Sequence, residues 1–77
     1  MQEIEMIPVD STNISAVGYD GLTQKLRVEF KSGQLYEYSG VEAPVFDSFL
    51  RAPSKGVFFA SQIAKRDAQK YPSERIR

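Results

Sequence analysis

Residues 30–38, FKSGQLYEY, decide the fold of this 77-residue chain, because the turn within them sets which way both tyrosines face. Alternating apolar and polar residues flank a Ser-Gly corner, which is typical of a β-hairpin. A two-residue turn at Ser32-Gly33 would set Phe30 opposite Leu35 and place both tyrosines on the charged face. A three-residue turn with a left-handed Gly33 would set Phe30 opposite Gln34 and reverse that arrangement.

We favour the three-residue turn, because it gathers the apolar residues on one face and pairs opposite charges on the other. In this register the expected pairs are Val28 with Tyr36, Leu26 with Tyr38, and Arg27 with Glu37. Both tyrosines then belong mainly to the core, with a phenol hydroxyl reaching its rim.

Composition limits the chemistry that this chain can perform. It contains no cysteine and no histidine, which excludes Cys/His and Ser-His-Asp nucleophilic sites, haem ligation by these residues and nearly every zinc arrangement. Paired acids in a desolvated cleft are not indicated either. We therefore expect no catalytic residue, no metal and no cofactor, and conclude that the protein is not an enzyme.

The sequence also bears on location. The N-terminal segment carries two acids and no basic region, so we expect no signal peptide. No apolar run approaches the roughly 20 residues of a membrane span. Together with the lack of cysteine, these features indicate a soluble, cytoplasmic protein with no membrane partner.

The net charge is zero, but the charges are distributed unequally along the chain. Residues 1–47 contain three basic and eight acidic residues, whereas residues 48–77 contain seven basic and two acidic residues. In one interpretation an acidic sheet and a basic helix attract each other within the fold. In the other, the basic half binds a polyanion. We favour the first and keep the second open.

The first half of the chain predicts strands. Residues 14–19 and 22–30 are expected to pair through an Asp20-Gly21 turn in which the glycine takes a positive φ, and residues 34–38 form the third strand. Residues 1–8 form either an extended arm or a fourth edge strand, because Pro8 cannot donate to a central ladder.

The second half predicts helices. The first opens near Pro44 and ends at about residue 52, before the next proline. The second is capped by Ser54, becomes regular near Phe58 and ends around Tyr71. Residues 72–77 are expected to form a basic flexible tail.

These elements predict one α+β domain over residues 9–71. Its fold class is an antiparallel three-stranded β-meander, with the N-terminal segment as a fourth edge strand if it pairs, followed by two helices packed on one face. The expected structural core consists of Leu26, Val28, Phe30, Tyr36, Tyr38, Phe49, Phe59 and Ile63.

The order of several short motifs resembles the KTSC domain family. The motifs are Ser11-x-x-Ile14, Gly18-Tyr19-Asp20, Leu26-x-Val28-x-Phe30-x-x-Gly33, Tyr36-Glu37-Tyr38, Val41, APSKGVFF at residues 52–59, and Ile63. Together they cover residues 9–66. The chain departs from the pattern at Ala60, where a polar residue such as asparagine is expected, so a contact made by that side chain in relatives should be absent here.

The resemblance carries implications for function. The KTSC domain is appended to the C-terminus of some lysyl-tRNA synthetases and also occurs alone in small bacterial and phage-like proteins. This chain resembles the stand-alone form. The family has no established activity, and its context suggests RNA binding.

The candidate binding residues are basic or aromatic. Basic side chains on the second helix would contact phosphates without reading base sequence, and an exposed aromatic ring would stack on bases. Ser54-Lys55-Gly56 begins this helix and acts as a cap alone, or as a cap that also contacts an anion. The candidate nucleic-acid-binding residues are Lys55, Phe58, Lys65, Arg66, Lys70 and Tyr19.

Two functional hypotheses follow. In the first, a non-catalytic module binds RNA or another polyanion through its basic C-terminal helix. In the second, the protein is a homodimer or an accessory to a larger protein assembly and binds no nucleic acid. There the acidic sheet of one molecule would meet the basic helix of another, anchored by an exposed Phe58 or Leu35.

Overall fold

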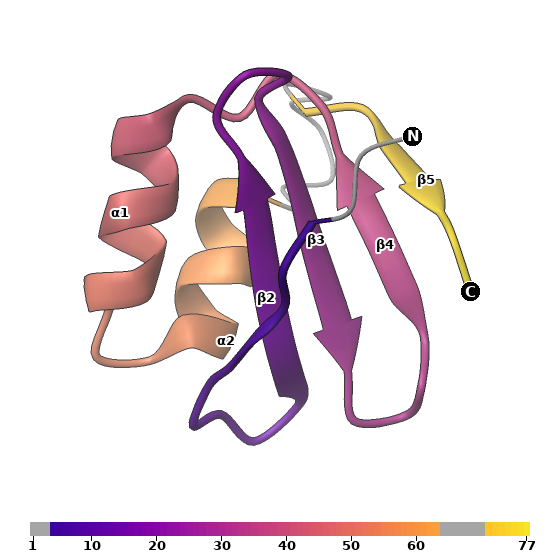
Figure 1. The fold of residues 1–77 in the computed structure, drawn as a ribbon. Helices are drawn as coiled ribbons and strands as arrows, with labels where there is room; N and C mark the ends of the chain where they lie inside the picture. The colour runs from indigo at the N-terminus through magenta and orange to yellow at the C-terminus, as the bar shows by residue number, and fades with distance from the viewer. Residues whose placement is uncertain (1–3, 64–70) are drawn as a thin grey trace.

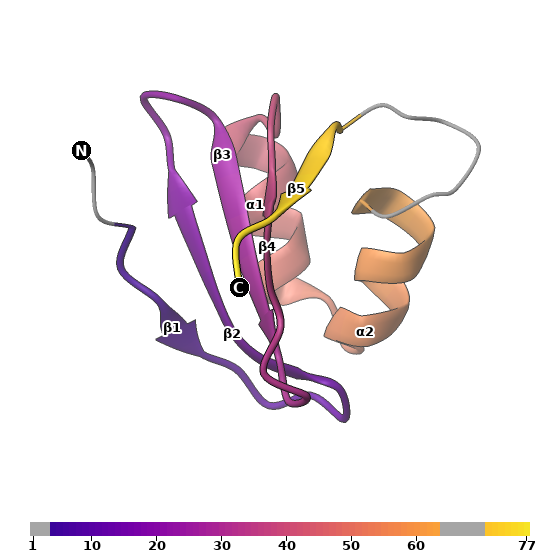
Figure 2. The ribbon, with the colours of Figure 1, turned by 90° about the vertical axis from the view of Figure 1, so that its right-hand side faces the viewer.

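The computed structural model describes residues 4–63 and 71–77, which form a five-stranded antiparallel sheet with helices on one face (Figures 1 and 2). In chain order the elements are β1 (Ile7–Pro8), β2 (Ile14–Asp20), β3 (Lys25–Phe30), β4 (Leu35–Tyr38), α1 (Ala43–Arg51), α2 (Lys55–Phe58), the π-helix η1 (Phe59–Ile63) and β5 (Ser73–Arg75). The strands follow the order β1-β2-β3-β4-β5. The predicted α+β class, with the meander preceding the helices, is confirmed.

The β3–β4 turn has the three residues that the sequence favours. The backbone N–H of Phe30 donates to the carbonyl of Gln34 at 2.9 Å, and the N–H of Gly33 donates to the carbonyl of Phe30 at 2.8 Å. Gly33 has a φ of 100°, which a residue with a side chain rarely adopts. The resulting pairs, Leu26 with Tyr38, Arg27 with Glu37 and Val28 with Tyr36, confirm the predicted register.

The β2–β3 turn differs from the expectation. β3 begins at Lys25, and residues 21–24 form the turn instead of a two-residue Asp-Gly corner. Among the described residues of this turn, Gln24 takes the positive φ, at 57°, and Gly21 does not. The Asp20 carboxylate accepts from the backbone N–H of Leu22 at 2.9 Å, so an aspartate side chain closes the turn that the sequence assigned to glycine.

The C-terminal residues 72–77, expected as a flexible tail, instead supply β5. The backbone N–H of Leu35 donates to the carbonyl of Arg77 at 3.0 Å, and the Arg77 guanidinium pairs with Glu29 on β3. All side chains of β5 are exposed. The strand therefore lacks the apolar alternation by which a sequence pattern reveals a strand, and backbone pairing with β4 holds it in place.

The N-terminal segment pairs as an edge strand, one of the two interpretations open from the sequence. Residues before β1 cross the face of the sheet opposite the helices (Figure 2). There a Cβ atom on Gly18 would lie 2.6 Å from the Ile4 Cγ2 and 2.7 Å from the Glu5 carbonyl oxygen. A glycine at this position of β2 is thus what allows the segment to approach the sheet.

α1 begins and ends close to the expected residues, and α2 begins directly after its predicted cap. α1 has Pro44 in its first turn and ends one residue before Ala52. The Ser54 hydroxyl accepts from the backbone N–H of Val57 at 3.4 Å and caps α2, which begins at Lys55, three residues earlier than expected. The remainder of the expected second helix, residues 64–70, lies outside the described residues.

The core lies between the sheet and the helices, with Phe59 contacting three rings. Its ring centroid is 5.4 Å from that of Phe30, 5.4 Å from that of Tyr38 and 6.4 Å from that of Phe49. Of the eight expected core residues, Phe30 and Tyr36 are half-buried against this cluster. The buried ones are Leu26, Val28, Tyr38, Phe49, Phe59 and Ile63.

Candidate nucleic-acid interface

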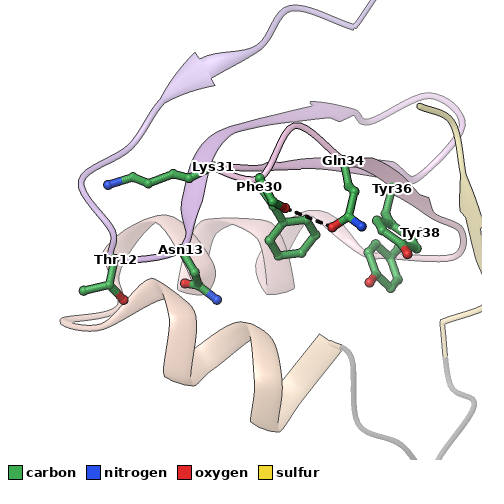
Figure 3. Close-up of a pocket in the computed structure, with 8 residues that line it drawn as sticks. Thr12, Asn13, Phe30, Lys31, Gln34, Tyr36 and Tyr38 are labelled. Carbon is green, nitrogen blue, oxygen red and sulfur yellow. Dashed lines mark hydrogen bonds between the residues drawn. The ribbon is translucent and has the colours of Figure 1, made fainter.

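A hollow of about 660 Å³ opens between the turn end of the sheet and α2 (Figure 3). We call it the hairpin hollow. It forms where two loops meet, because the backbone N–H of Lys31 donates to the carbonyl of Asn13 at 2.9 Å and holds the 10–13 loop beside the β3–β4 turn. The described lining residues are Thr12, Asn13, Phe30, Lys31, Ser32, Gln34, Tyr36 and Tyr38.

Aromatic rings form the floor of the hairpin hollow. Phe30, Tyr36 and Tyr38 come from β3 and β4 and point from the sheet toward α2 (Figure 3). The Phe30 and Tyr36 rings meet edge to face, with centroids 5.9 Å apart, and the Tyr36 and Tyr38 rings lie roughly parallel, 6.5 Å apart. Tyr38 is buried, whereas Tyr36 and Phe30 keep part of each ring accessible.

The hydroxyls of Tyr36 and Tyr38 retain some contact with solvent, because the described residues contain no buried side-chain oxygen without a partner. Among the described residues, neither Tyr36 nor Tyr38 has a hydrogen-bond partner for its hydroxyl. Burial raises the pKa of Tyr38, and the neighbouring Tyr36 adds to the rise. Tyr38 therefore keeps its proton at neutral pH and can donate a hydrogen bond to a ligand.

Two amide side chains stand at the rim of the hairpin hollow, each held through its oxygen by a serine. The Ser32 hydroxyl donates to Gln34 Oε1 at 3.0 Å, and the Ser11 hydroxyl donates to Asn13 Oδ1 at 3.3 Å. These contacts turn both amide oxygens toward the serines. The NH₂ groups of both amides have no partner among the described residues, so they can donate to a ligand.

The hairpin hollow has a positive rim. Its described lining includes the Lys31 ammonium and no carboxylate. Most described cations elsewhere are neutralised: Arg27 and Lys25 contact Glu37 at 2.8 and 3.5 Å. The side chain of Lys31 has neither an ion pair nor a hydrogen bond within the described part of the chain, so its charge is available to an anion.

The opposite face of the sheet is occupied by its own ion pairs. The Arg27 guanidinium, donating a hydrogen bond to Glu37, holds the pKa of that carboxyl below its usual value against the opposing effect of burial, and Lys25 adds to the lowering. The acidic sheet is thus partly neutralised by basic residues of its own strands, an arrangement that the separate charge counts of the two halves did not reveal.

The structure places the predicted binding residues in different surroundings. Tyr19 stacks on Phe46, with ring centroids 4.7 Å apart, and its hydroxyl donates to the Val41 carbonyl, while burial, Glu42 and Asp20 raise its pKa. Phe58 stacks on Phe49 at 5.6 Å. The Lys55 ammonium lies 3.5 Å from the Ala52 carbonyl oxygen. The other three, Lys65, Arg66 and Lys70, lie outside the described residues.

Sequence reasoning did not single out three residues of the rim: Asn13, Lys31 and Gln34. The three-residue turn already carried a signal for Gln34, because a residue opposite the inward-facing Phe30 shares its face of the sheet. No local pattern marked Asn13 or Lys31. Their proximity depends on a backbone hydrogen bond between loops that are distant in sequence.

Two further searches of the described residues bear on chemistry and location. Among residues 4–63 and 71–77, no three acidic side chains come close enough together to hold a metal ion. Within the same ranges, no helix has the length and apolar character needed to cross a bilayer.

The fold and the hairpin hollow define a small α+β domain with an aromatic-floored, basic-rimmed recess at one end of its sheet. A family model described as the KTSC domain matches residues 10–66. The chain therefore belongs to the KTSC domain family, as its sequence motifs predicted.

The relatives include both small proteins and much larger enzymes. A crystal structure of a KTSC domain protein from Yersinia pestis has a TM-score of 0.83 at 32% identity and covers 97% of this chain and 100% of its own. An uncharacterized protein from Stutzerimonas stutzeri is 35% identical over 68 residues, 88% of this chain and 94% of that protein. A lysine–tRNA ligase from Nostoc sp. is 39% identical over 54 residues, 70% of this chain but 10% of the ligase.

Proposed function

We propose that this protein is a non-catalytic RNA-binding domain and that RNA engages the hairpin hollow. The observation that carries the proposal is the lining of the hairpin hollow, which combines half-exposed rings with Lys31, a residue that has no acidic partner among the described residues. An available cation attracts a phosphate, and an accessible aromatic face stacks on a base. Proteins that bind single-stranded nucleic acid combine these two features.

The basic residues expected from the sequence extend this surface in the proposal. Gly56 of α2 approaches the rim so closely that a Cβ atom there would lie 2.9 Å from Asn13 Oδ1. Lys55 precedes it, and Lys65, Arg66 and Lys70 follow η1 in the sequence. We assign phosphate contacts to these lysines and this arginine and base contacts to the hairpin hollow.

The family relationship supports the same conclusion. Part of a lysine–tRNA ligase from Nostoc sp. resembles this chain, and the name of that enzyme specifies tRNA. A domain that supplies RNA affinity to such a ligase would need no catalytic residues of its own. We carry over only the class of ligand, since the chain spans a tenth of the ligase.

The alternative of a protein-interaction module is less well supported. Leu35, one proposed anchor, is buried, and Phe58, the other, packs on Phe49. The large apolar side chains exposed within the described residues come from four separate segments, so none of these elements offers an apolar patch by itself. Light scattering of the free protein, run beside the RNA titration, would detect self-association.

Fluorescence anisotropy of a labelled single-stranded RNA oligonucleotide, titrated at several salt concentrations, tests the proposal. We expect micromolar affinity that weakens with salt, and Lys31→Ala should lower the log–log slope by about one. Arg51→Ala removes the same charge from α1, where Arg51 pairs with Asp47, and serves as the matched control. No binding, or equal effects of the two variants, would contradict the proposal.

A further inference from the structure

The hairpin hollow contains several hydrogen-bond donors that have no partner among the described residues. The NH₂ groups of Asn13 and Gln34 are free of described partners because serine hydroxyls bind the amide oxygens. The hydroxyls of Tyr36 and Tyr38 add two further donors over the aromatic floor. A recess lined in this way complements a flat ligand whose edge carries carbonyl oxygens.

Building on the proposed RNA-binding function, we propose that the hairpin hollow takes one unpaired nucleobase and prefers a keto base, uracil or guanine, over adenine. The base would stack on the accessible part of Tyr36, and a ring carbonyl oxygen would accept from the NH₂ group of Gln34 or Asn13. Lys31 at the rim would neutralise the attached phosphate. Contacts to the base would let the hairpin hollow distinguish between bases, whereas a phosphate contact by itself would not.

The dimensions of the site are consistent with one nucleotide. Its volume of about 660 Å³ lies within the roughly 300–1,000 Å³ of small-molecule sites. The hollow is open, and Tyr36 retains accessible ring surface. A base that is paired within a duplex could not present its hydrogen-bonding edge and its face to these groups at once, so the site selects an unpaired nucleotide.

The proposal can be tested with two purine nucleotides, because stacking would bind them equally whereas hydrogen bonding would favour the one with a carbonyl group. Inosine and adenosine 5′-monophosphates share the ring system, ribose and phosphate, and differ at position 6, where inosine has a carbonyl and adenosine an amino group. Ribose 5-phosphate carries the same sugar and phosphate without a base. Equal stacking would make the two nucleotides equivalent, whereas donor groups at the rim favour inosine.

The experiment titrates the isotope-labelled full chain with each of the three ligands at millimolar concentrations and follows amide shifts by NMR. We expect shifts of the Asn13 and Gln34 side-chain NH₂ groups, affinity for the inosine nucleotide about threefold to tenfold above that for the adenosine nucleotide, and the weakest affinity for ribose 5-phosphate. Equal affinity for all three ligands, or no shift in the hairpin hollow with any of them, would overturn the proposal.

Four variants separate the contribution of hydrogen bonding from that of stacking. Gln34→Met keeps the length of the side chain but removes its donor, and should bring the two nucleotide affinities together. Gln62→Met makes the same change at an exposed residue of η1 that does not line the hollow, and should leave the ratio unchanged. Tyr36→Leu should weaken both nucleotides about tenfold, with circular dichroism confirming the fold, while Tyr36→Phe should retain the stacking.

The RNA titration above distinguishes failure of this inference from failure of the proposed function. RNA binding that depends on Lys31, combined with equal affinity for all three small ligands, would retain an RNA-binding domain that contacts phosphates and reject the base site. Absence of RNA binding would reject the function, and nucleotide binding with the inosine preference would then identify a nucleotide site instead.

Discussion

Phe30 and Gln34 form the last backbone pair of the β3–β4 hairpin, with the amide nitrogen of Phe30 2.9 Å from the carbonyl oxygen of Gln34. This pair sets the register of every residue behind it, because side chains alternate between the two faces of a strand. It directs Tyr36 and Tyr38 toward the helices and places Gln34 at the rim of the hairpin hollow. The core and the candidate site therefore depend on the same three-residue turn.

The three-residue β3–β4 turn requires the left-handed backbone conformation of Gly33. Its φ of 100° is strained for any residue with a Cβ atom, although a Cβ atom there would meet nothing within 4 Å. We expect Gly33→Ala to lower the free energy of unfolding by about 1–2 kcal/mol, measured by urea denaturation. The cost is conformational, since no neighbour is displaced.

Gly21→Ala provides the matched control for this substitution. Gly21 lies in the other hairpin turn without a positive φ, and a Cβ atom there would make an ordinary 3.7 Å contact with Tyr19. We expect a change of about 0.5 kcal/mol toward greater stability, because alanine restricts the unfolded chain. Equal losses of stability in both variants would argue against the left-handed turn as the determinant of register.

The structure of a segment could be predicted where its own sequence pattern indicates it. It could not be predicted where contacts with residues distant in sequence determine it. The register of residues 26–38 followed from alternation and one glycine, and the ends of α1 from two prolines. β5 escaped prediction because its side chains are exposed and its partners are backbone groups of β4. The Asp20-Gly21 turn was misassigned because the Asp20 side chain, and not the glycine, shapes the backbone there.

The candidate site shows the same division. Tyr36 and Tyr38 were predicted to belong mainly to the core, as their alternation with Glu37 implies; Tyr38 is buried, and Tyr36 is half-buried. The contribution of Lys31 was missed because its isolation from acids is a property of the folded surface and not of its neighbours in sequence. Asn13 joins the site only through a loop contact eighteen positions away, which no periodicity encodes.

The crossing of the N-terminal segment over β2 predicts a second glycine effect. A Cβ atom on Gly18 would lie 2.6 Å from Ile4 Cγ2, 2.7 Å from the Glu5 carbonyl oxygen and 2.9 Å from Met6 Sδ. Gly18→Ala should therefore displace this segment and cost about 1–3 kcal/mol, as overpacking does. Hydrogen exchange should show loss of protection at the backbone pairing between β1 and β2.

A truncated background tests whether the N-terminal segment is the cause. With residues 1–6 deleted, Gly18→Ala has no segment to displace and should be neutral or slightly stabilising, since alanine suits a strand better than glycine does. The same cost in the full and truncated chains would mean that the substitution acts through the sheet itself.

The ion pairs of Glu37 predict a pH-dependent contribution to stability. The Arg27 contact lowers the pKa of this carboxyl from its ordinary value of 4.5, so the charged carboxylate stabilises the folded state relative to the unfolded state. The stabilisation is complete above pH 4.5 and is lost as the pH falls through the lowered pKa. Glu37→Gln should cost about 1 kcal/mol at neutral pH and nothing once the carboxyl is protonated.

Urea denaturation of the unmodified protein and of Glu37→Gln, from neutral pH down to the pH at which Glu37 is protonated, measures the difference in their free energies of unfolding. Asp47→Asn serves as the control, because Asp47 pairs with Arg51 where both side chains are well exposed. That pair should contribute only a few tenths of a kcal/mol at any pH. A Glu37→Gln penalty that persists at low pH would mean that packing, and not charge, stabilises this position.

Tyr19 lies near the end of β2 that is remote from the hairpin hollow. Unlike Tyr36, it has a hydrogen-bond partner for its hydroxyl within the described residues. Its hydroxyl donates to the carbonyl of Val41, which is fully buried, and its ring stacks on Phe46. Tyr19→Phe leaves that carbonyl without its partner and should cost about 1 kcal/mol of stability. It should leave the affinity for single-stranded RNA unchanged, because the hydroxyl that is removed is bonded within the protein and the ring is kept.

Tyr36→Phe should leave stability nearly unchanged and keep the stacking ring, while it removes one hydroxyl donor to the ligand. The Tyr36 hydroxyl has no hydrogen-bond partner within the described residues, so its removal should change stability by less than about 0.5 kcal/mol. Measuring urea denaturation and RNA anisotropy on both variants separates a structural tyrosine from one that faces a ligand. If Tyr36→Leu leaves RNA binding unchanged, the bases do not stack on Tyr36 and the proposed base contact is wrong.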